Sequence, residues 1–339
     1  GSVELLKNAG VGERIISDGI KHDGFLISSE NESFRIDLSA ATGKSVYVYG
    51  QTEVTIDLYK AQDKMKANIF HCVKDVNISD LNSTKSKVQF NCSKENYEIT
   101  CDYIAGCDGS MGISKNYIPK KIKKSHIINY PFSWLGILSN TKPVNDELIY
   151  ASHEKGFALA SMRNENLSRY YIQTTHTDKI ENWPDELFWE ELCIRLPKPY
   201  CRTLERGKSI EKSITKLRSL ILEPMQWKNL FLAGDAAHIM PPTGAKGLNL
   251  AFSDIFYLSQ GFISYYKKGS STKLNNYSKI ALKRVWKTVG FSKWMTSILH
   301  NSNENSLIER NLNKLELAEL KKSEKAQKLV AEQYVGVAY

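Results

Sequence analysis

The sequence predicts a mixed α/β protein, with an antiparallel sheet in the middle of the chain and helices toward its C-terminal end. Three observations predict this class: β-like runs over residues 24–107, alternating segments over 130–217, and a strand after Asn229 that is followed by long helical patterns. With 339 residues and 42% hydrophobic content, the chain can bury a large core and suits about two domains.

The first zone is predicted to hold short strands and one helix. The helix covers about residues 53–66. The β-like runs lie at 24–28, 34–39, 45–50, 69–76, 87–92 and 97–109. The middle zone alternates polar and apolar residues, which is typical of antiparallel strands with polar and aromatic side chains on one face. Its segments are 132–139, 147–152, 156–163 and 168–175, with a helix-like stretch around Trp189.

The last zone begins with "LFLAGDAAHIMPPTGAKGLNLAFSD", residues 230–254. A buried strand over 230–233 ends just before Asp235, the position at which open α/β sheets bind ligands. The carboxylate can accept hydrogen bonds from sugar or polyol hydroxyls, and Gly234 lets a ligand approach the backbone. A helix starting near Gly247 would direct N–H groups at an anionic or electron-rich group. Alone, the motif also fits an ordinary strand-to-helix loop.

A second motif of this kind is "YIAGCDGSMGIS", residues 103–114. Its Asp108-Gly109 pair follows a β-like run and suits a tight turn beside an extended ligand.

Composition excludes several other functional classes. No window of 18 apolar residues and no signal peptide is visible, so we expect no membrane association and a cytoplasmic location. The six cysteines form no CxxC pair and have no histidine at metal spacing, which predicts free buried thiols and no metal site.

The net charge is +9, and the densest basic run covers 115–124, where Tyr117 is the only aromatic residue. We therefore expect no nucleic-acid partner and interpret the run as a solvated face or an attractor of small anions.

Five segments carry a resemblance to a known family: 48–55 ("VYGQTEVT"), 102–109 ("DYIAGCDG"), 230–254, 293–300 ("KWMTSILH") and 332–336 ("EQYVG"). Together they resemble the 4-hydroxybenzoate 3-monooxygenase (p-hydroxybenzoate hydroxylase) family of FAD-dependent aromatic hydroxylases, from about Val3 to the last residue. The resemblance implies that NAD(P)H reduces FAD and that the reduced flavin uses oxygen to convert 4-hydroxybenzoate to 3,4-dihydroxybenzoate in aromatic catabolism. It also implies a homodimer, and the protein's partner would be a small aromatic acid.

The resemblance assigns roles to individual residues near the substrate. Tyr150 would meet the phenol oxygen, Tyr334 would be its partner in a proton relay, and His22 would carry the relay to solvent. The substrate carboxylate would be bound by Ser161, Arg163 and Tyr171, while the carbonyl of Pro242 would lie against the ring. Alternation places Ser161 and Arg163 on the same face of their strand. Each of these residues alone also fits a packing, surface or capping role.

The resemblance further implies flavin contacts at Gln51, Asp108, Asp235, Leu248 and Asn249. Arg169 and Trp134 would support the site, although core packing explains Trp134 equally well. Where the family often has an aromatic residue and a histidine, this chain has Ser110 and Met111, which leaves NADH and NADPH open as alternatives.

No GxGxxG occurs in the chain, which begins downstream of the phosphate loop that the family places first. We therefore expect a Rossmann-like FAD-binding domain that is incomplete at its N-terminus, with poor FAD binding and reduced stability. This domain would comprise residues 1–125 and 226–339, the latter with a C-terminal helical region, and the substrate sheet would comprise 126–225. The alternatives are a non-catalytic or truncated aromatic-acid binding protein and a basic nucleic-acid binder, whose binding would depend strongly on salt.

Overall fold

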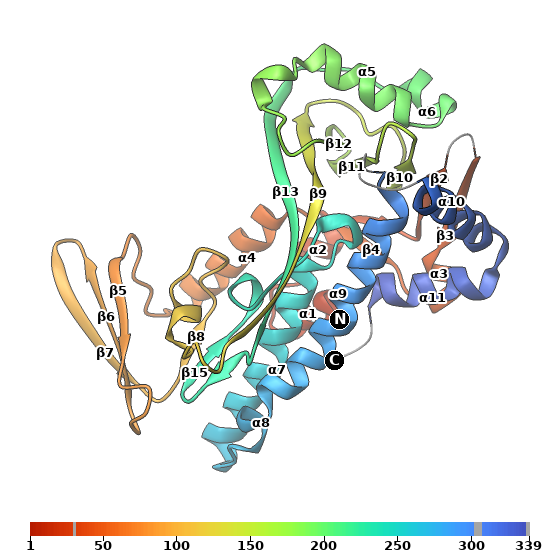
Figure 1. Cartoon of the computed structure of the whole chain (residues 1–339). Coiled ribbons are helices and arrows are strands. Elements are labelled where there is room, and N and C mark those ends of the chain that lie inside the picture. Colours follow the sequence, from red (N-terminus) through yellow and green to blue (C-terminus); the bar gives the residue numbers. More distant parts are fainter. Residues whose placement is uncertain (30–31, 302–306, 337–339) are drawn as a thin grey trace.

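The computed structural model describes residues 1–29, 32–301 and 307–336, and it has the mixed α/β class that the sequence predicts (Figure 1). Its centre is an eight-stranded sheet. In spatial order the strands are β16 (His238–Ile239), β13 (Ser209–Glu223), β9 (Lys124–Ser139), β12 (Leu167–Thr174), β11 (Ala158–Asn164), β10 (Ile149–Ser152), β2 (Gly24–Ser29) and β3 (Glu32–Asp37). Neighbours pair antiparallel except β10 and β2, which run parallel. The antiparallel sheet expected in the middle of the chain is confirmed.

The central sheet reaches beyond the segment 126–225 that was expected to form it. Parallel pairing of Ile149 with Leu26 adds β2 and β3 at one end, and pairing of Leu220 with Ile239 adds β16 at the other. Backbone pairing thus draws in strands from both flanking segments, because the sheet edges would otherwise leave unpaired N–H and C=O groups. The division of the chain into three domains stays a prediction.

Three smaller sheets complete the β structure. One contains β14 (Gln226–Trp227), β15 (Leu230–Leu232) and β8 (Ile104–Gly106), and its strands β15 and β8 are parallel neighbours. The other two consist of β5 (Lys74–Ser79), β6 (Ser86–Cys92) and β7 (Glu95–Cys101), and of β1 (Ile20–His22) and β4 (Val46–Val48). Because β15 and β8 are parallel, the Asp235 and Asp108 motifs that follow them leave the same edge of one sheet.

The described helices lie at both ends of the chain and between β12 and β13. They are α1 (Ser2–Asn8), α2 (Glu13–Ser17), α3 (Leu38–Thr42), α4 (Gln51–Lys64), α5 (Asp185–Arg195), α6 (Lys198–Thr203), α7 (Gly247–Lys268), α8 (Thr272–Asn275), α9 (Tyr277–Leu299), α10 (Leu307–Lys322) and α11 (Glu324–Val335). Short 3-10 turns follow β15 at Gly234–Ala236 and β16 at Pro242–Gly244. The long C-terminal helices were expected from the sequence, whereas α1 and α2 were not.

The predicted strand at 34–39 is wrong in its last two residues. Strand β3 ends at Asp37, whose Oδ1 accepts a hydrogen bond from the backbone N–H of Ala40 at 2.8 Å. Aspartate is a favoured helix N-cap because its carboxylate satisfies a free N–H of the first turn. The chain therefore turns from strand to helix at this residue.

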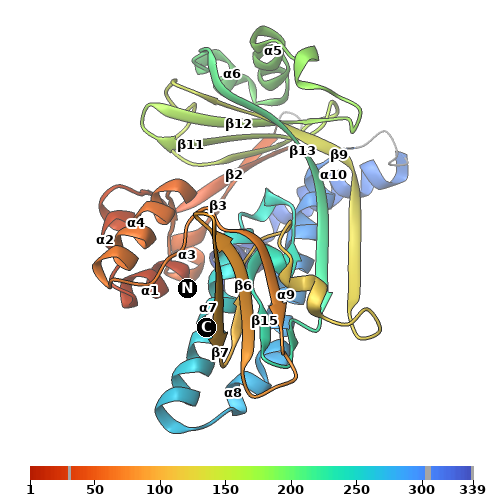
Figure 2. The ribbon, with the colours of Figure 1, turned by 90° about the vertical axis from the view of Figure 1, so that its left-hand side faces the viewer.

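Hydrophobic cores lie on both faces of the central sheet. Figure 2 shows α5 and α6 above the sheet and α7 and α9 on the opposite side. On the α5 face, Phe188 and Leu192 pack against Tyr170 and Ile172, and all four are fully buried. The other face packs against α9, α10 and α11 through a core that contains Phe25, Phe157 and Leu299, among others. Both faces of the sheet are therefore covered by apolar side chains. Ser292, Thr296 and His300, at the α9 side, are polar residues that are nevertheless buried.

The expectation of free, buried thiols is wrong for all six cysteines. Cys193 and Cys201 form a disulfide, because the chain reverses between α5 and α6 and brings their Cα atoms to 4.8 Å. Cys72 and Cys107 are free but exposed, and Cys92 and Cys101 are free but only half-buried. Within the described ranges we find no cluster of His, Cys, Asp or Glu suited to a metal ion. Among the same residues, no helix has the length and apolar character needed to cross a membrane.

Candidate active site

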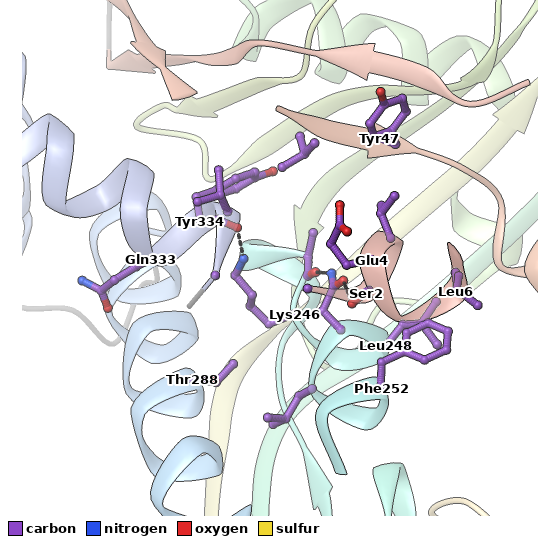
Figure 3. A pocket seen from close by; sticks show the side chains of 18 of the residues that line it. Ser2, Glu4, Leu6, Tyr47, Lys246, Leu248, Phe252, Thr288, Gln333 and Tyr334 are labelled. Atoms are coloured by element: carbon purple, nitrogen blue, oxygen red, sulfur yellow. Dashed lines mark hydrogen bonds between the residues drawn. The ribbon is translucent and has the colours of Figure 1, made fainter. Parts of the chain in front are cut away.

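One cavity of about 1310 Å³ brings most of the predicted site residues together. Helices α1, α7, α9 and α11 and strands β4, β9, β10, β11 and β12 all contribute to its walls. The predicted residues that line it are Tyr150, Ser161, Arg163, Tyr171, Pro242, Leu248, Asn249 and Tyr334. Figure 3 shows Tyr334, Lys246 and Leu248 around this space. His22, Gln51, Asp108 and Asp235 are outside its lining.

Tyr150 and Tyr334 form a buried hydrogen-bonded pair. Their hydroxyl oxygens are 2.9 Å apart, although 184 positions separate them in the chain. Phe25 packs against both rings, with centroid distances of 5.4 Å to Tyr150 and 4.3 Å to Tyr334. Burial raises the pKa of Tyr150 well above its ordinary value and raises the pKa of Tyr334 to about 12. Both hydroxyls therefore keep their protons at neutral pH and can pass a proton along their hydrogen bond without either becoming a phenolate.

His22 does not bond directly to this pair. It lies on β1, opposite Val46 of β4, and is 1% exposed. Neither ring nitrogen has a hydrogen-bond partner among the described residues, and burial lowers the pKa of the imidazole. The ring is therefore neutral at neutral pH, and its place in a relay stays a prediction.

The predicted carboxylate-binding residues lie on adjacent strands. Ser161 and Arg163 are on β11 and Tyr171 is on β12. Ser161 donates a hydrogen bond from Oγ to the carbonyl of Arg169 at 2.6 Å. Arg163 is exposed, donates from Nη1 to the carbonyl of Met162 at 3.1 Å, and has no acidic partner in the described part of the chain. Its guanidinium can therefore bind a ligand carboxylate without first breaking an ion pair.

Tyr171 owes its position to two neighbours. A Cβ added at Gly136 would lie only 2.6 Å from Cε1 of Tyr171, so the ring occupies space that only glycine leaves free. Arg169 donates from Nε to the Tyr171 hydroxyl at 3.1 Å, and its guanidinium lies 5.1 Å from the ring centroid. Arg169 also pairs with Glu211 at 2.9 Å. The supporting role expected for Arg169 thus has a physical basis in the contacts that hold Tyr171.

Lys246 is a site residue that sequence reasoning missed. It is 7% exposed, lines the cavity, and donates from Nζ to the backbone carbonyl of Tyr334 (Figure 3). The ammonium also lies 4.9 Å from the Tyr334 ring centroid, a cation–π arrangement. Burial lowers the pKa of Lys246 to about 7, since no carboxylate within the described ranges pairs with it. A negative charge that forms in the cavity would favour the protonated amine. The only sequence feature that could have pointed to this role is the position of the lysine in the Gly-Ala-Lys-Gly loop that precedes α7.

The two aspartate motifs meet at one sheet edge, as parallel strands require. Asp108 accepts a hydrogen bond from the backbone N–H of Ser114 at 2.8 Å, and Asp235 is exposed after β15. Gly234 has φ +62, a conformation that favours glycine, and its N–H donates to Asp254 at 2.9 Å. The loop that carries Asp235 is therefore fixed by its backbone while its carboxylate stays available. Gln51 is exposed at the start of α4.

Three observations indicate that the cavity and its lining residues fit FAD. The cavity exceeds the roughly 300–1,000 Å³ of ordinary ligand pockets, so it has room for more than one small molecule. Among the described residues that line it, ten are lysine or arginine and one, Glu4, is acidic, which suits a dinucleotide with two phosphates. A Cβ at Gly247, the first residue of α7, would meet nothing within 4 Å, so the N-terminus of this helix is accessible to an anion. Leu248 and Asn249 would then contact the cofactor.

His300 predicts how the stability of the protein depends on pH. Burial lowers its pKa to about 3, whereas an unfolded histidine titrates at about 6.5. The unfolded chain therefore binds the proton first, and stability is lost as the pH falls from about 6.5 toward 3. Between pH 7.5 and pH 5 the free energy of unfolding should fall by about 2 kcal/mol because of this residue.

We expect His300→Gln to remove that contribution, since glutamine can both donate and accept at this position and does not titrate. The measurement is denaturant unfolding of both proteins at several pH values. His71→Gln, at an exposed histidine, is the control. Equal pH slopes for His300→Gln and the wild-type protein would contradict the prediction.

The comparisons with known proteins agree with this geometry. The FAD binding domain family matches residues 1–292. The chain is 49% identical over 339 residues to p-hydroxybenzoate hydroxylase of Acinetobacter baylyi, an alignment that covers 100% of this chain and 84% of that protein. Its fold is similar to that of p-nitrophenol 4-monooxygenase from Pseudomonas putida, with a TM-score of 0.81, 15% identity, and coverage of 99% of this chain and 87% of the other. PqsL of P. aeruginosa, solved with 2-aminobenzoylacetate, gives a TM-score of 0.75, 15% identity and coverage of 88% and 83%. This chain therefore belongs to the p-hydroxybenzoate hydroxylase family of FAD-dependent monooxygenases.

Proposed function

We propose that this protein hydroxylates 4-hydroxybenzoate beside its phenol group, giving 3,4-dihydroxybenzoate. The observation that supports this most directly is that one cavity holds both the Tyr150–Tyr334 pair and the guanidinium of Arg163, which has no acidic partner among the described residues. A 4-hydroxybenzoate molecule carries a carboxylate and a phenol at opposite ends of a ring. The cavity offers a matching cation and a matching pair of hydroxyls.

Arg163 binds the carboxylate of the substrate, and the hydroxyl of Tyr171, which accepts from Arg169, donates a hydrogen bond to it. Ser161 adds another when its hydroxyl turns from the carbonyl of Arg169 toward the ligand. A planar guanidinium can bind both carboxylate oxygens, which fixes the direction of the ring as well as its position. The carbonyl of Pro242 would contact one face of the substrate ring. Pro242 lies in the loop between β16 and α7, residues 240–246, which we call the flavin loop. These contacts would align one ring carbon with the cofactor.

Tyr150 accepts the phenol proton while its own proton moves to Tyr334. Ring hydroxylation is an electrophilic attack, so the phenolate reacts faster than the phenol. The raised pKa values of both tyrosines favour passage of the proton through their hydroxyls over the formation of a tyrosinate. The cationic lining and Lys246 stabilise the negative charge on the substrate.

When bound, FAD would accept electrons from NAD(P)H and activate oxygen. The protein's own residues bind, orient and deprotonate the substrate. Leu248, Asn249, Asp235, Asp108 and Gln51 are the residues that we propose hold the cofactor. His22 is proposed to return the proton to solvent.

Three ligands test the proposed function with the FAD-loaded protein. 4-Hydroxybenzoate should bind and yield 3,4-dihydroxybenzoate in amounts that match NAD(P)H consumption. Benzoate lacks the phenol and should bind without giving product, while 4-hydroxybenzyl alcohol lacks the carboxylate and should bind weakly. A protein that binds 4-hydroxybenzoate but forms no product would instead be an aromatic-acid binding protein.

A homodimer formed through the C-terminal helices is proposed on the basis of their exposed apolar side chains. Trp286, Leu312, Leu315 and Leu329 are 45%, 56%, 57% and 59% exposed. Light scattering of the purified protein tests this, and a monomeric mass at micromolar concentration would contradict it. The cytoplasmic location expected from the sequence stays a prediction.

A further inference from the structure

Three buried polar side chains form a row along α9. Ser292, Thr296 and His300 follow one another at intervals of four residues and are 0%, 0% and 1% exposed. At 3.6 residues per turn, this spacing puts them on one face of the helix and its C-terminal cap. The last two belong to the "KWMTSILH" segment, whose purpose the site described above leaves unexplained. We call these three residues the polar row.

His300 connects the polar row to the wall of the substrate cavity. The indole Nε1 of Trp134 donates to Nε2 of His300 at 2.7 Å. The other ring nitrogen, Nδ1, lies 2.8 Å from the carbonyl of Thr296 and must donate to it, because a carbonyl can only accept. Phe132 and Phe157 stack on the imidazole, with centroid distances of 4.6 Å and 4.3 Å. The position of Trp134, which lines the cavity, is thereby fixed from behind.

The other two residues connect the polar row to the flavin loop. Ser292 donates from Oγ to the carbonyl of Pro241 at 3.0 Å. The hydroxyls of Thr243 and Thr296 are 2.9 Å apart, and Thr296 donates in turn to the carbonyl of Ser292 at 2.7 Å. These bonds hold the chain immediately before and immediately after Pro242. The proline that lines the cavity is therefore attached to α9 on both sides.

A serine or threonine in a helix commonly bonds to the carbonyl four residues earlier, and this bond alone has no functional meaning. Ser297 makes such a bond to Lys293 at 3.0 Å and faces solvent. The polar row differs because its side chains are fully buried and also bond to two other parts of the chain. Burial of hydroxyl and imidazole groups is costly unless their hydrogen bonds are complete, so a purely structural contact would be served better by apolar side chains.

We infer that Ser292, Thr296 and His300 are positioning residues that hold two walls of the active-site cavity, Pro242 and Trp134, at a fixed separation. The inference rests on the proposed function, since it assigns to α9 the task of shaping the site in which the aromatic acid is aligned. The loop brings Pro242 from the segment after β16, and β9 brings Trp134. A single rigid helix that bonds to the loop on both sides of Pro242 and, through His300, to Trp134 fixes the distance between these two walls.

Thr296→Val tests the centre of the row with nearly unchanged volume. We expect the dissociation constant of 4-hydroxybenzoate to rise about tenfold and the yield of product per NAD(P)H to fall, because one buried hydrogen-bond link is lost. The dissociation constant of FAD should stay within about twofold, since no predicted flavin contact is altered. Thr296→Ser keeps the hydroxyl and should restore substrate affinity and yield. Ser297→Ala is the matched control on the exposed side of α9 and should behave as wild type.

Two results would overturn the inference. The first is a Thr296→Val protein indistinguishable from Ser297→Ala. The second is an equal loss of FAD and substrate affinity that Thr296→Ser does not restore, which would indicate general destabilisation.

The indole N–H resonance of Trp134, assigned with Trp134→Phe, separates this inference from the proposed function. It should shift in His300→Gln, which replaces the ring nitrogen that accepts from the indole, and stay unchanged in Thr296→Ser and Ser297→Ala, whether or not the protein makes 3,4-dihydroxybenzoate. An unshifted resonance in His300→Gln, or a shifted one with wild-type affinity for 4-hydroxybenzoate, would contradict the positioning role even in an active enzyme. Absence of product from the wild-type protein, together with weaker binding of 4-hydroxybenzoate by His300→Gln and Thr296→Val, would contradict only the proposed function.

Discussion

Tyr150→Phe is expected to lower the rate of hydroxylation at least about 10²-fold, the usual contribution of a positioned proton acceptor. The substitution removes the hydroxyl that lies 2.9 Å from Tyr334, so the phenol of the substrate loses its route for proton transfer. Ring size and the packing against Phe25 are kept, and the dissociation constant of 4-hydroxybenzoate should therefore change less than about threefold. Rapid-mixing measurement of product formation, with the reduced FAD-loaded protein, gives the rate.

Tyr170→Phe provides the matched control for this change. Tyr170 is also fully buried, lies on β12 of the same sheet, and accepts a hydrogen bond from the N–H of Val144 at 3.2 Å. Its ring faces the core beneath α5 and away from the cavity. The control should hydroxylate at the wild-type rate. Coupled turnover by Tyr150→Phe at that same rate would exclude the tyrosine pair as the proton acceptor.

Arg163→Ala should raise the dissociation constant of 4-hydroxybenzoate about 10²-fold. Charge-assisted hydrogen bonds to a carboxylate contribute about 1.5–3 kcal/mol each. Arg169, the other cation beside Ser161 and Tyr171, is already paired with Glu211 at 2.9 Å. Arg163→Lys keeps the charge but loses the planar fork, so its affinity should fall between those of the alanine variant and the wild type. Titration of the flavin absorption with the ligand measures all three.

Arg202→Ala is the control for Arg163→Ala. Arg202 is exposed on α6, across the sheet from the cavity, so its removal changes the net charge equally without altering the site. Affinity for 4-hydroxybenzyl alcohol should be nearly the same in both variants and the wild type, because this ligand has no carboxylate. If Arg163→Ala left the dissociation constant of 4-hydroxybenzoate unchanged, Arg163 would not be the residue that binds the substrate carboxylate.

The elements near the site could be predicted because their signals are local. Alternation places Ser161 and Arg163 on one face, and the structure has both on β11. A hydrophobic run followed by Gly-Asp predicted a strand over 230–233 that ends before Asp235, and β15 ends at Leu232. The parallel pairing that brings Asp108 to the same edge is a long-range contact, which neither motif predicts by itself.

The features that sequence reasoning missed depend on tertiary burial. Nothing local to Lys246 shows that the ammonium will be 7% exposed beside Tyr334, which is 88 positions away. His300 resembles any helix-terminal histidine until the structure places it against Trp134. The disulfide between Cys193 and Cys201 requires the reversal between α5 and α6, which the spacing of the cysteines does not reveal.

The central claim is that the protein binds 4-hydroxybenzoate as a phenolate that is formed through Tyr150. The most direct measurement is the ultraviolet difference spectrum of the ligand on the FAD-loaded protein as the pH is raised from 6 to 9. We predict that the bound ligand ionises well below the value of about 10 typical of a phenol hydroxyl, and that Tyr150→Phe moves its ionisation back upward. A bound ligand that stays a phenol across this range, or one that ionises equally in both proteins, would contradict the account.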